Sequence, residues 1–168
     1  MKLVITESRD WEMCWQIYQH PEVCDRITND SWGALDLETR MSHVQLLVEN
    51  PRNHLLLVRD EEQSGLIVGC FLCDQKEEGT FEVHTMLLPG CRGADAIVAG
   101  RLGIKHMMGL PGVQRLVSYC PQSHKEILFF ALKCGFHRVG LAALTWIKNG
   151  VTYPLQTVEL NQKDLPCR

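Results

Sequence analysis

The segment from residue 81 to residue 136 constrains the fold of this chain more than any other. An apolar strand over Phe81–Leu88 runs into the turn Pro89-Gly90, and a long helix begins a few residues later. A second strand, Gln114–Cys120, and a second helix follow. A strand that turns directly into a helix leaves backbone N–H groups free at the helix N-terminus, and such groups bind anions. The sequence therefore predicts an anion-binding turn around residues 91–97.

The helix after this turn is predicted to pack closely on a sheet. Its apolar residues recur at helical spacing, and most of them are small: Ala96, Ile97, Gly100, Gly103, Ile104 and Met107. Arg101 and Lys105 fall on the opposite face. Two glycines inside a helix cost roughly 1 kcal/mol each relative to alanine. Close approach of the helix backbone to its neighbours is a physical reason for that cost.

The remaining elements follow from periodicity and turn residues. Strands are expected at Leu3–Glu7, His54–Arg59 and Leu66–Cys73, with a closing hairpin of Leu141–Lys148 and Val151–Leu160. One helix is expected to begin at Trp11, and two more are expected over Glu22–Ile27 and Leu37–Glu49. A further helix should follow a capping box formed by Ser123 and Glu126. The segment Thr28–Leu35 is typical of a loop. Three successive strands after the first helices indicate an α+β fold, a mixed and mainly antiparallel sheet flanked by helices.

Composition limits the class of protein. The 168 residues are expected to form one domain over residues 1–160 with a tail over 161–168, and a net charge of −3 argues against nucleic acid as a partner. No apolar run approaches the ~20 residues of a membrane span. The eight cysteines lie mostly in apolar runs, which favours free thiols and a cytoplasmic location. Cys70 and Cys73 would point to opposite faces of a strand, so no metal site is predicted.

The central segment resembles the GNAT superfamily of N-acetyltransferases. The resemblance is carried by the run from Leu87 to Ala96 and by Lys133-Cys134-Gly135-Phe136, about forty residues on, and the element order agrees along nearly the whole chain. Arg92-Gly93 and Ala96 resemble the Arg-Gly-x-x-Ala variant of small bacterial and phage members. The resemblance implies the GNAT fold and an acetyl group taken from acetyl-CoA.

The resemblance also implies which residues bind the cofactor. The pyrophosphate of acetyl-CoA would lie on the backbone amides of the turn, and its pantetheine arm would run along the end of the preceding strand. His124 is a further candidate, because the family often has Asn at that position. The implied cofactor-binding residues are Met86, Leu87, Leu88, Arg92, Gly93, Ala94, Asp95, Ala96, Ile97 and His124. Arg92 either contacts phosphate through its side chain or is a solvated turn arginine. Asp95 departs from the family pattern, because a carboxylate repels phosphate unless it points outward or caps the helix.

The candidate catalytic residues are Glu82, His84 and Tyr119. Glu82 and His84 are two residues apart on the strand that leads into the turn, and hence on one face. Either can take the proton from an amine, Glu82 can orient His84, or both can simply meet solvent at the edge of the sheet. The family often has a general-acid tyrosine where this chain has Ala131. Tyr119 is the nearest replacement, and protonation of the leaving group by solvent is the alternative.

Two functions remain open from the sequence. The first is an N-acetyltransferase that transfers acetyl from acetyl-CoA to a primary amine of a small molecule or a protein by direct attack in a ternary complex. The second is a module that keeps the fold, in a phage context for example, without turnover; the departures at Asp95 and Ala131 motivate it. A homodimer is also possible, because the edge of the closing hairpin offers unpaired backbone groups.

Overall fold

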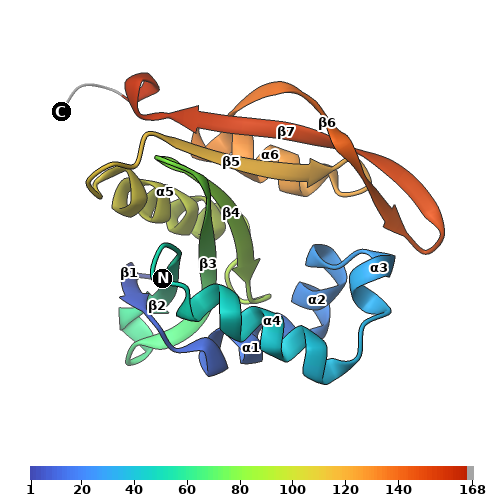
Figure 1. Cartoon of the computed structure of the whole chain (residues 1–168). Coiled ribbons are helices and arrows are strands. Elements are labelled where there is room, and N and C mark those ends of the chain that lie inside the picture. The colour runs from blue at the N-terminus through green and yellow to red at the C-terminus, as the bar shows by residue number, and fades with distance from the viewer. Residues whose placement is uncertain (166–168) are drawn as a thin grey trace.

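The computed structural model describes residues 1–165 and confirms the predicted α+β class. A seven-stranded sheet has the order β1-β2-β3-β4-β5-β7-β6, and every neighbouring pair is antiparallel except β4 and β5 (Figure 1). The strands are β1 (Leu3–Ser8), β2 (His54–Asp60), β3 (Leu66–Glu77), β4 (Thr80–Leu87), β5 (Arg115–Pro121), β6 (His137–Lys148) and β7 (Val151–Asn161).

Helices cover both faces of the sheet. The α-helices are α1 (Trp11–Gln19), α2 (Pro21–Ile27), α3 (Asp30–Gly33), α4 (Leu37–Glu49), α5 (Ala94–Met108) and α6 (Lys125–Cys134); short 3₁₀ turns occupy η1 (Glu61–Gln63) and η2 (Gln162–Asp164). One core lies between the sheet and α5 and α6, and a second lies between the sheet and α1 and α4. Alternation along β4 serves both cores, since Phe81 and Leu87 face the first while Met86 faces the second.

Helix α5 packs as its small residues predict. A Cβ atom added at Gly103 would lie 3.0 Å from the ring of Phe71 on β3, and one added at Gly100 would overlap Cys134 of α6. Arg101 and Lys105 are exposed, as expected. The glycines therefore set the separation of α5 from the sheet and from α6.

Besides the end of β3, which lies at Glu77 rather than at Cys73, four local predictions differ from the structure. The loop predicted over Thr28–Leu35 contains the short helix α3, because the Asn29 side chain accepts a hydrogen bond from the Trp32 N–H and starts a helical turn. Strand β6 begins at His137, four residues earlier than predicted. In the predicted tail, Asn161 ends β7 and Gln162–Asp164 forms η2, while residues 166–168 lie outside the described part of the chain.

The capping box at α6 is the fourth difference, and that prediction is wrong. His124 is the N-cap of α6 and makes no side-chain capping bond. The His124 N–H donates to the Pro121 carbonyl at 3.0 Å, which closes a turn with Ser123 inside it. Ser123 therefore lies one residue too early to cap the helix.

Several other features agree with the sequence. Asp10 and Asp36 cap α1 and α4 through bonds from the N–H groups of Met13 and Thr39. The hairpin turn Asn149-Gly150 has φ of 53° and 73°, the left-handed pair that a two-residue turn requires. The cysteines among residues 1–165 are free thiols, and most are buried; Cys167 lies outside the described residues. Within those residues, no helix has the length and apolar character that crossing a membrane requires.

The edge strand β6 carries exposed apolar side chains, Val139 and Leu141 among them. This is the edge at which the sequence allows a homodimer. The homodimer stays a prediction that the mass of the protein in solution would test.

A carboxylate shared by two histidines ties the first strand to its neighbours. Glu7 of β1 lies 2.7 Å from His54 Nδ1 and 3.5 Å from His106 Nε2. Burial acts to raise the pKa of Glu7, but the two imidazoles outweigh it, and the pKa lies below its ordinary value of 4.5.

Replacing Glu7 with glutamine is expected to lower the free energy of unfolding at neutral pH by about 0.5–1 kcal/mol, the range of partly exposed pairs. Because the folded pKa is depressed, this stability is present above pH 4.5 and is lost as pH falls through the folded pKa. Urea melts at pH 7 and pH 3 measure the effect. An equal loss of stability at both pH values would contradict it.

Candidate active site

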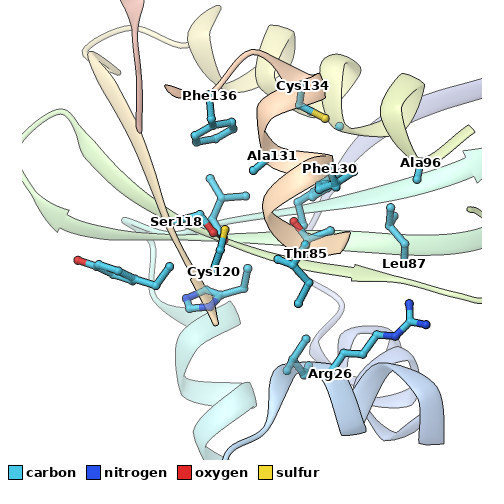
Figure 2. Close-up of a pocket in the computed structure, with 18 of the residues that line it drawn as sticks. Arg26, Thr85, Leu87, Ala96, Ser118, Cys120, Phe130, Ala131, Cys134 and Phe136 are labelled. Carbon is cyan, nitrogen blue, oxygen red and sulfur yellow. The ribbon is translucent and has the colours of Figure 1, made fainter. Parts of the chain in front are cut away.

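A large pocket opens between β4 and β5, with a volume of about 990 Å³. Thr85 and Leu87 of β4, Ser118 and Cys120 of β5, and Phe130, Ala131 and Cys134 of α6 line it, with Ala96 of α5 and Arg26 of α2 at one end (Figure 2). Its volume lies at the upper end of the range for pockets that bind cofactors and small molecules.

The pocket exists because β4 and β5 separate. They pair only over Thr80–Glu82 and Arg115–Val117. Beyond that point the Ser118 hydroxyl donates to the Val83 carbonyl at 3.1 Å, and Arg92 Nη1 donates to the Leu87 carbonyl at 2.7 Å. Thr85 lies two residues from both Val83 and Leu87 along the strand, so its backbone groups face the same gap. The gap is therefore bordered by main-chain groups of β4 that can pair with an extended ligand.

One end of this gap has the features that an anion site requires. Gly93 is the N-cap of α5, has φ of 60°, and no side chain caps the first turn of the helix. Arg92 Nη2 is buried and has no hydrogen-bond partner among residues 1–165, and Arg26 lines the same pocket. Burial, and then the charge of Arg26, lower the pKa of Arg92 below its ordinary value. Two neighbouring guanidinium groups beside a free helix N-terminus suit an anion with several negative oxygens.

The carboxylate of Asp95 does not face the positive end of the pocket formed by Arg92 and Arg26. Its carboxylate lies 3.8 Å from the amino nitrogen of Met1, and the residue does not line the pocket. The carboxylate therefore points outward, which is the condition under which the turn can accept phosphate.

A second polar group lies where β4 begins to leave β5. Asp74 of β3 lies 2.8 Å from His84 Nε2, while the ammonium of Lys76 lies 2.6 Å from Asp74 and 2.7 Å from Glu82. Glu82 is farther from His84, at 3.8 Å. Asp74 is buried, whereas the His84 side chain is 40% exposed. His84 is thus held by a buried carboxylate and stays open to the pocket.

The charges of this cluster are stable near neutral pH. Burial acts to raise the pKa of Asp74, but hydrogen bonds from His84 and Lys76 outweigh it, and the pKa lies below its ordinary value. Burial acts to lower the pKa of Lys76, but Asp74 and Glu82 outweigh it, and the pKa lies above its ordinary value. An ionised Asp74 accepts only, so His84 Nε2 carries the hydrogen of this bond, and in the neutral imidazole Nδ1 then has the lone pair. The arrangement can remove a proton from a bound amine.

Asp74, Glu82 and His84 could also be compared with a metal site. Their ligand atoms lie within 4.8 Å of one another. The Lys76 ammonium already contacts both carboxylates and supplies the positive charge at this place. The absence of a metal stays a prediction from the sequence.

The family model for DUF2824, described as a protein of unknown function, matches residues 55–165. The chain belongs to this family. A comparison with curated proteins gives no match.

Solved structures show the fold more specifically. Spermidine N-acetyltransferase from Vibrio cholerae, in complex with CoA and spermine, has a TM-score of 0.78 at 9% identity over 97% of each chain. A chimera of the Vibrio cholerae enzyme SpeG with hSSAT has a TM-score of 0.76 at 10% identity, again over 97% of each chain. At this identity the likeness shows the fold alone. This DUF2824 member therefore has the GNAT fold that its central segment resembles.

The structure brings most of the predicted site residues to the one pocket. Those that line it are Glu82, His84, Leu87, Arg92, Gly93, Ala96, Ile97 and Tyr119. Met86 and Leu88 instead pack in the core on the α1 and α4 side, and Ala94, Asp95 and His124 are not among the lining residues. His124 Nδ1 lies 3.5 Å from Glu126. Of these residues, Ala94 and Asp95 belong to the turn, and it is their backbone amides rather than their side chains that could contact a ligand.

Three residues of the site are missing from the sequence prediction: Arg26, Asp74 and Lys76. Asp74 directly follows an apolar strand segment, and this position is only a weak sequence indication of a functional residue. No feature of the sequence around Arg26 indicates a functional role. Cys120 lines the pocket, but burial raises the pKa of its thiol to about 11, which disfavours the thiolate that covalent catalysis needs.

Proposed function

We propose that this protein is an acetyl-CoA-dependent N-acetyltransferase that acts on a primary amine by direct attack in a ternary complex. One observation carries the proposal: the gap between β4 and β5 ends at a helix N-terminus without a side-chain cap, beside Arg92, whose Nη2 is buried without a partner in the described part of the chain. Such a site matches a molecule that has an extended amide-bearing arm at one end and a diphosphate at the other. The complex of the Vibrio cholerae neighbour with CoA supports this assignment.

The residues present fit acetyl-CoA. Amides around Gly93–Ala96, with Arg92 and Arg26, would hold the pyrophosphate. The exposed backbone of β4 from Val83 to Leu87 would pair with the pantetheine arm. Acetyl-CoA supplies the activated acetyl group, and the remaining chemistry is proton transfer by this chain.

We infer that His84 takes the proton and that Asp74 orients it. The 2.8 Å hydrogen bond that His84 Nε2 donates to Asp74 orients the imidazole and leaves Nδ1 free, and the Lys76 ammonium neutralises Glu82. This favours His84 over Glu82 as the base. Tyr119 lines the pocket from β5 and is the protein group proposed to protonate the CoA thiolate.

One observation favours the second function, a binding module without turnover. Ala131 is buried in the pocket wall at the position where the family often has its acid, so no hydroxyl is available there. Such a module would bind CoA through the same gap and release no thiol.

Calorimetry with CoA tests the proposal. We expect binding that weakens about tenfold in each of Arg92→Ala and Arg26→Ala, the effect of losing one charge-assisted contact. Arg101→Ala is the matched control, because Arg101 lies on the exposed face of α5 and donates to the Lys133 carbonyl. No binding of CoA at millimolar concentration would reject the proposal.

Thiol release with acetyl-CoA over a panel of amines separates the two functions. The panel begins with spermidine, which the neighbour's name suggests, and includes monoamines and a lysine peptide. Turnover that His84→Ala abolishes supports the enzyme. Tight CoA binding without thiol release across the panel supports the binding module.

A further inference from the structure

A second cavity adjoins the large pocket. It has a volume of about 450 Å³ and is lined by Ile27, Asn29, Ser31, Trp32, Leu35 and Trp146. Ile27, Asn29 and Trp146 line both cavities. The smaller cavity, called the tryptophan pocket below, is thus a side branch of the space that contains His84 and Glu82.

The walls of the tryptophan pocket come from distant parts of the chain and are tied together. The tip of the β6–β7 hairpin reaches α3 (Figure 1). There the Asp30 carboxylate accepts hydrogen bonds from the N–H groups of Asn149 and Gly150, both at 2.8 Å. Lys148 Nζ lies 2.9 Å from the Asp25 carboxylate and donates to the Asp25 and Thr28 carbonyls at 2.7 and 3.2 Å. These contacts hold Trp146 opposite the Trp32 segment.

Trp32 is itself held in place. Its indole N–H donates to the Tyr18 hydroxyl, and its ring meets that of His43 edge-on, with the centroids 5.0 Å apart. The indole is therefore oriented before any ligand binds. A preformed wall of this kind binds a rigid group with little loss of conformational entropy.

The chemistry of the tryptophan pocket selects an uncharged ring. No side chain that lines it is ionised, and the two carboxylates nearest in sequence, Asp25 and Asp30, are already bonded to the hairpin. A second ammonium group of a polyamine would find no carboxylate among the residues that line this cavity. Two indoles with Ile27 and Leu35 instead offer apolar faces and edges, against which aromatic rings pack well.

We propose that the tryptophan pocket binds the aromatic ring of an arylalkylamine acceptor whose amino group lies at the Asp74–His84 cluster. The inference rests on the proposed function, because it gives the substrate class of that same site. The proposed acceptor differs from spermidine, the substrate in the neighbours' names, in the part that lies beyond the reacting amine: an aromatic ring replaces a polyamine chain.

The test compares phenethylamine with butylamine by calorimetry, on the full chain, with and without CoA. We expect phenethylamine to bind about tenfold more tightly than butylamine. Leu35→Asp places a carboxylate at the rim of the tryptophan pocket and should remove that preference while leaving butylamine unchanged. Leu46→Asp is the matched control, since Leu46 is also an exposed leucine and lines neither cavity.

Two outcomes overturn the inference: equal binding of the two amines, or an equal effect of Leu35→Asp on both. If CoA binds and turns over while phenethylamine shows no preference, the inference fails and the proposed function stands. If CoA does not bind but phenethylamine shows the Leu35-dependent preference in the free protein, the proposed function fails and the aromatic site stands.

Discussion

Replacing His84 with alanine is expected to lower kcat for amine acetylation by about 10²–10⁴-fold, the usual contribution of a positioned general base. The affinity for CoA should not change, because His84 lies on the opposite face of β4 from the residues that face α5. Asp74 should stay ionised near neutral pH and keep its hydrogen bond to the imidazole, since its pKa lies below the ordinary value. Initial rates of thiol release from pH 5 to pH 9, with CoA affinity from calorimetry, measure both effects.

His137→Ala is the matched control for this substitution. His137 also pairs with a carboxylate, Glu159, at 3.3 Å, but it does not line the pocket. Its replacement should leave kcat and the pH profile unchanged. If His84→Ala retains activity within tenfold and Glu82→Gln abolishes it, Glu82 is the base and the assignment of His84 is wrong.

Asp74 is expected to act as a positioning residue. Asp74→Asn keeps the size of the side chain but removes the charge that stabilises a protonated His84. We expect a loss of about tenfold in kcat, with the acid limb of the pH–rate profile moved to lower pH. A purely structural role would lower activity at every pH without moving that limb.

The sequence predicted the strand, the turn and the helix around residues 91–97 well because their determinants are local. The apolar alternation of Phe81–Leu88, the turn Pro89-Gly90 and the helical period after Gly93 each act over a few residues. The resemblance to the GNAT superfamily rests on these same positions, and the comparison with solved structures confirms the fold that it implies. The mainly antiparallel sheet followed from the order of the elements, and it is confirmed.

The polar cluster could not be predicted because it depends on strand register. Glu82 faces Asp74 across β3 and β4, and His84 faces Leu72, so the bond from Asp74 to His84 is a diagonal one. The sequence predicted that this strand ends at Cys73, whereas β3 continues to Glu77 and brings Lys76 to Glu82. Arg26 was missed for a similar reason: nothing local in α2 indicates that it lies beside Arg92.

The second large effect concerns the contact between α5 and α6. A Cβ atom at Gly100 would overlap Cys134 Sγ and lie 2.9 Å from Phe130 Cζ. Gly100→Val adds two further methyl groups at this crossing, so α6 must shift or its side chains must leave their rotamers. We expect a loss of about 3 kcal/mol in the free energy of unfolding, the upper part of the usual range for overpacking. For a domain of this size that is a fall in Tm of about 6–12 °C.

Gly140→Val is the control, because a Cβ at Gly140 of β6 meets no atom within 4 Å and its Tm should hardly change. The double variant Gly100→Val, Cys134→Ala removes the nearest obstacle and should recover part of the loss, which a double-mutant cycle would show as coupling between the two positions. Additive effects would mean that Cys134 does not limit the approach of the helices.

Since Phe130 and Cys134 also line the large pocket, Gly100→Val should weaken CoA binding even at temperatures where the protein is folded. Unchanged CoA affinity would show that the pocket tolerates a displaced α6, and that the glycine at position 100 serves stability alone.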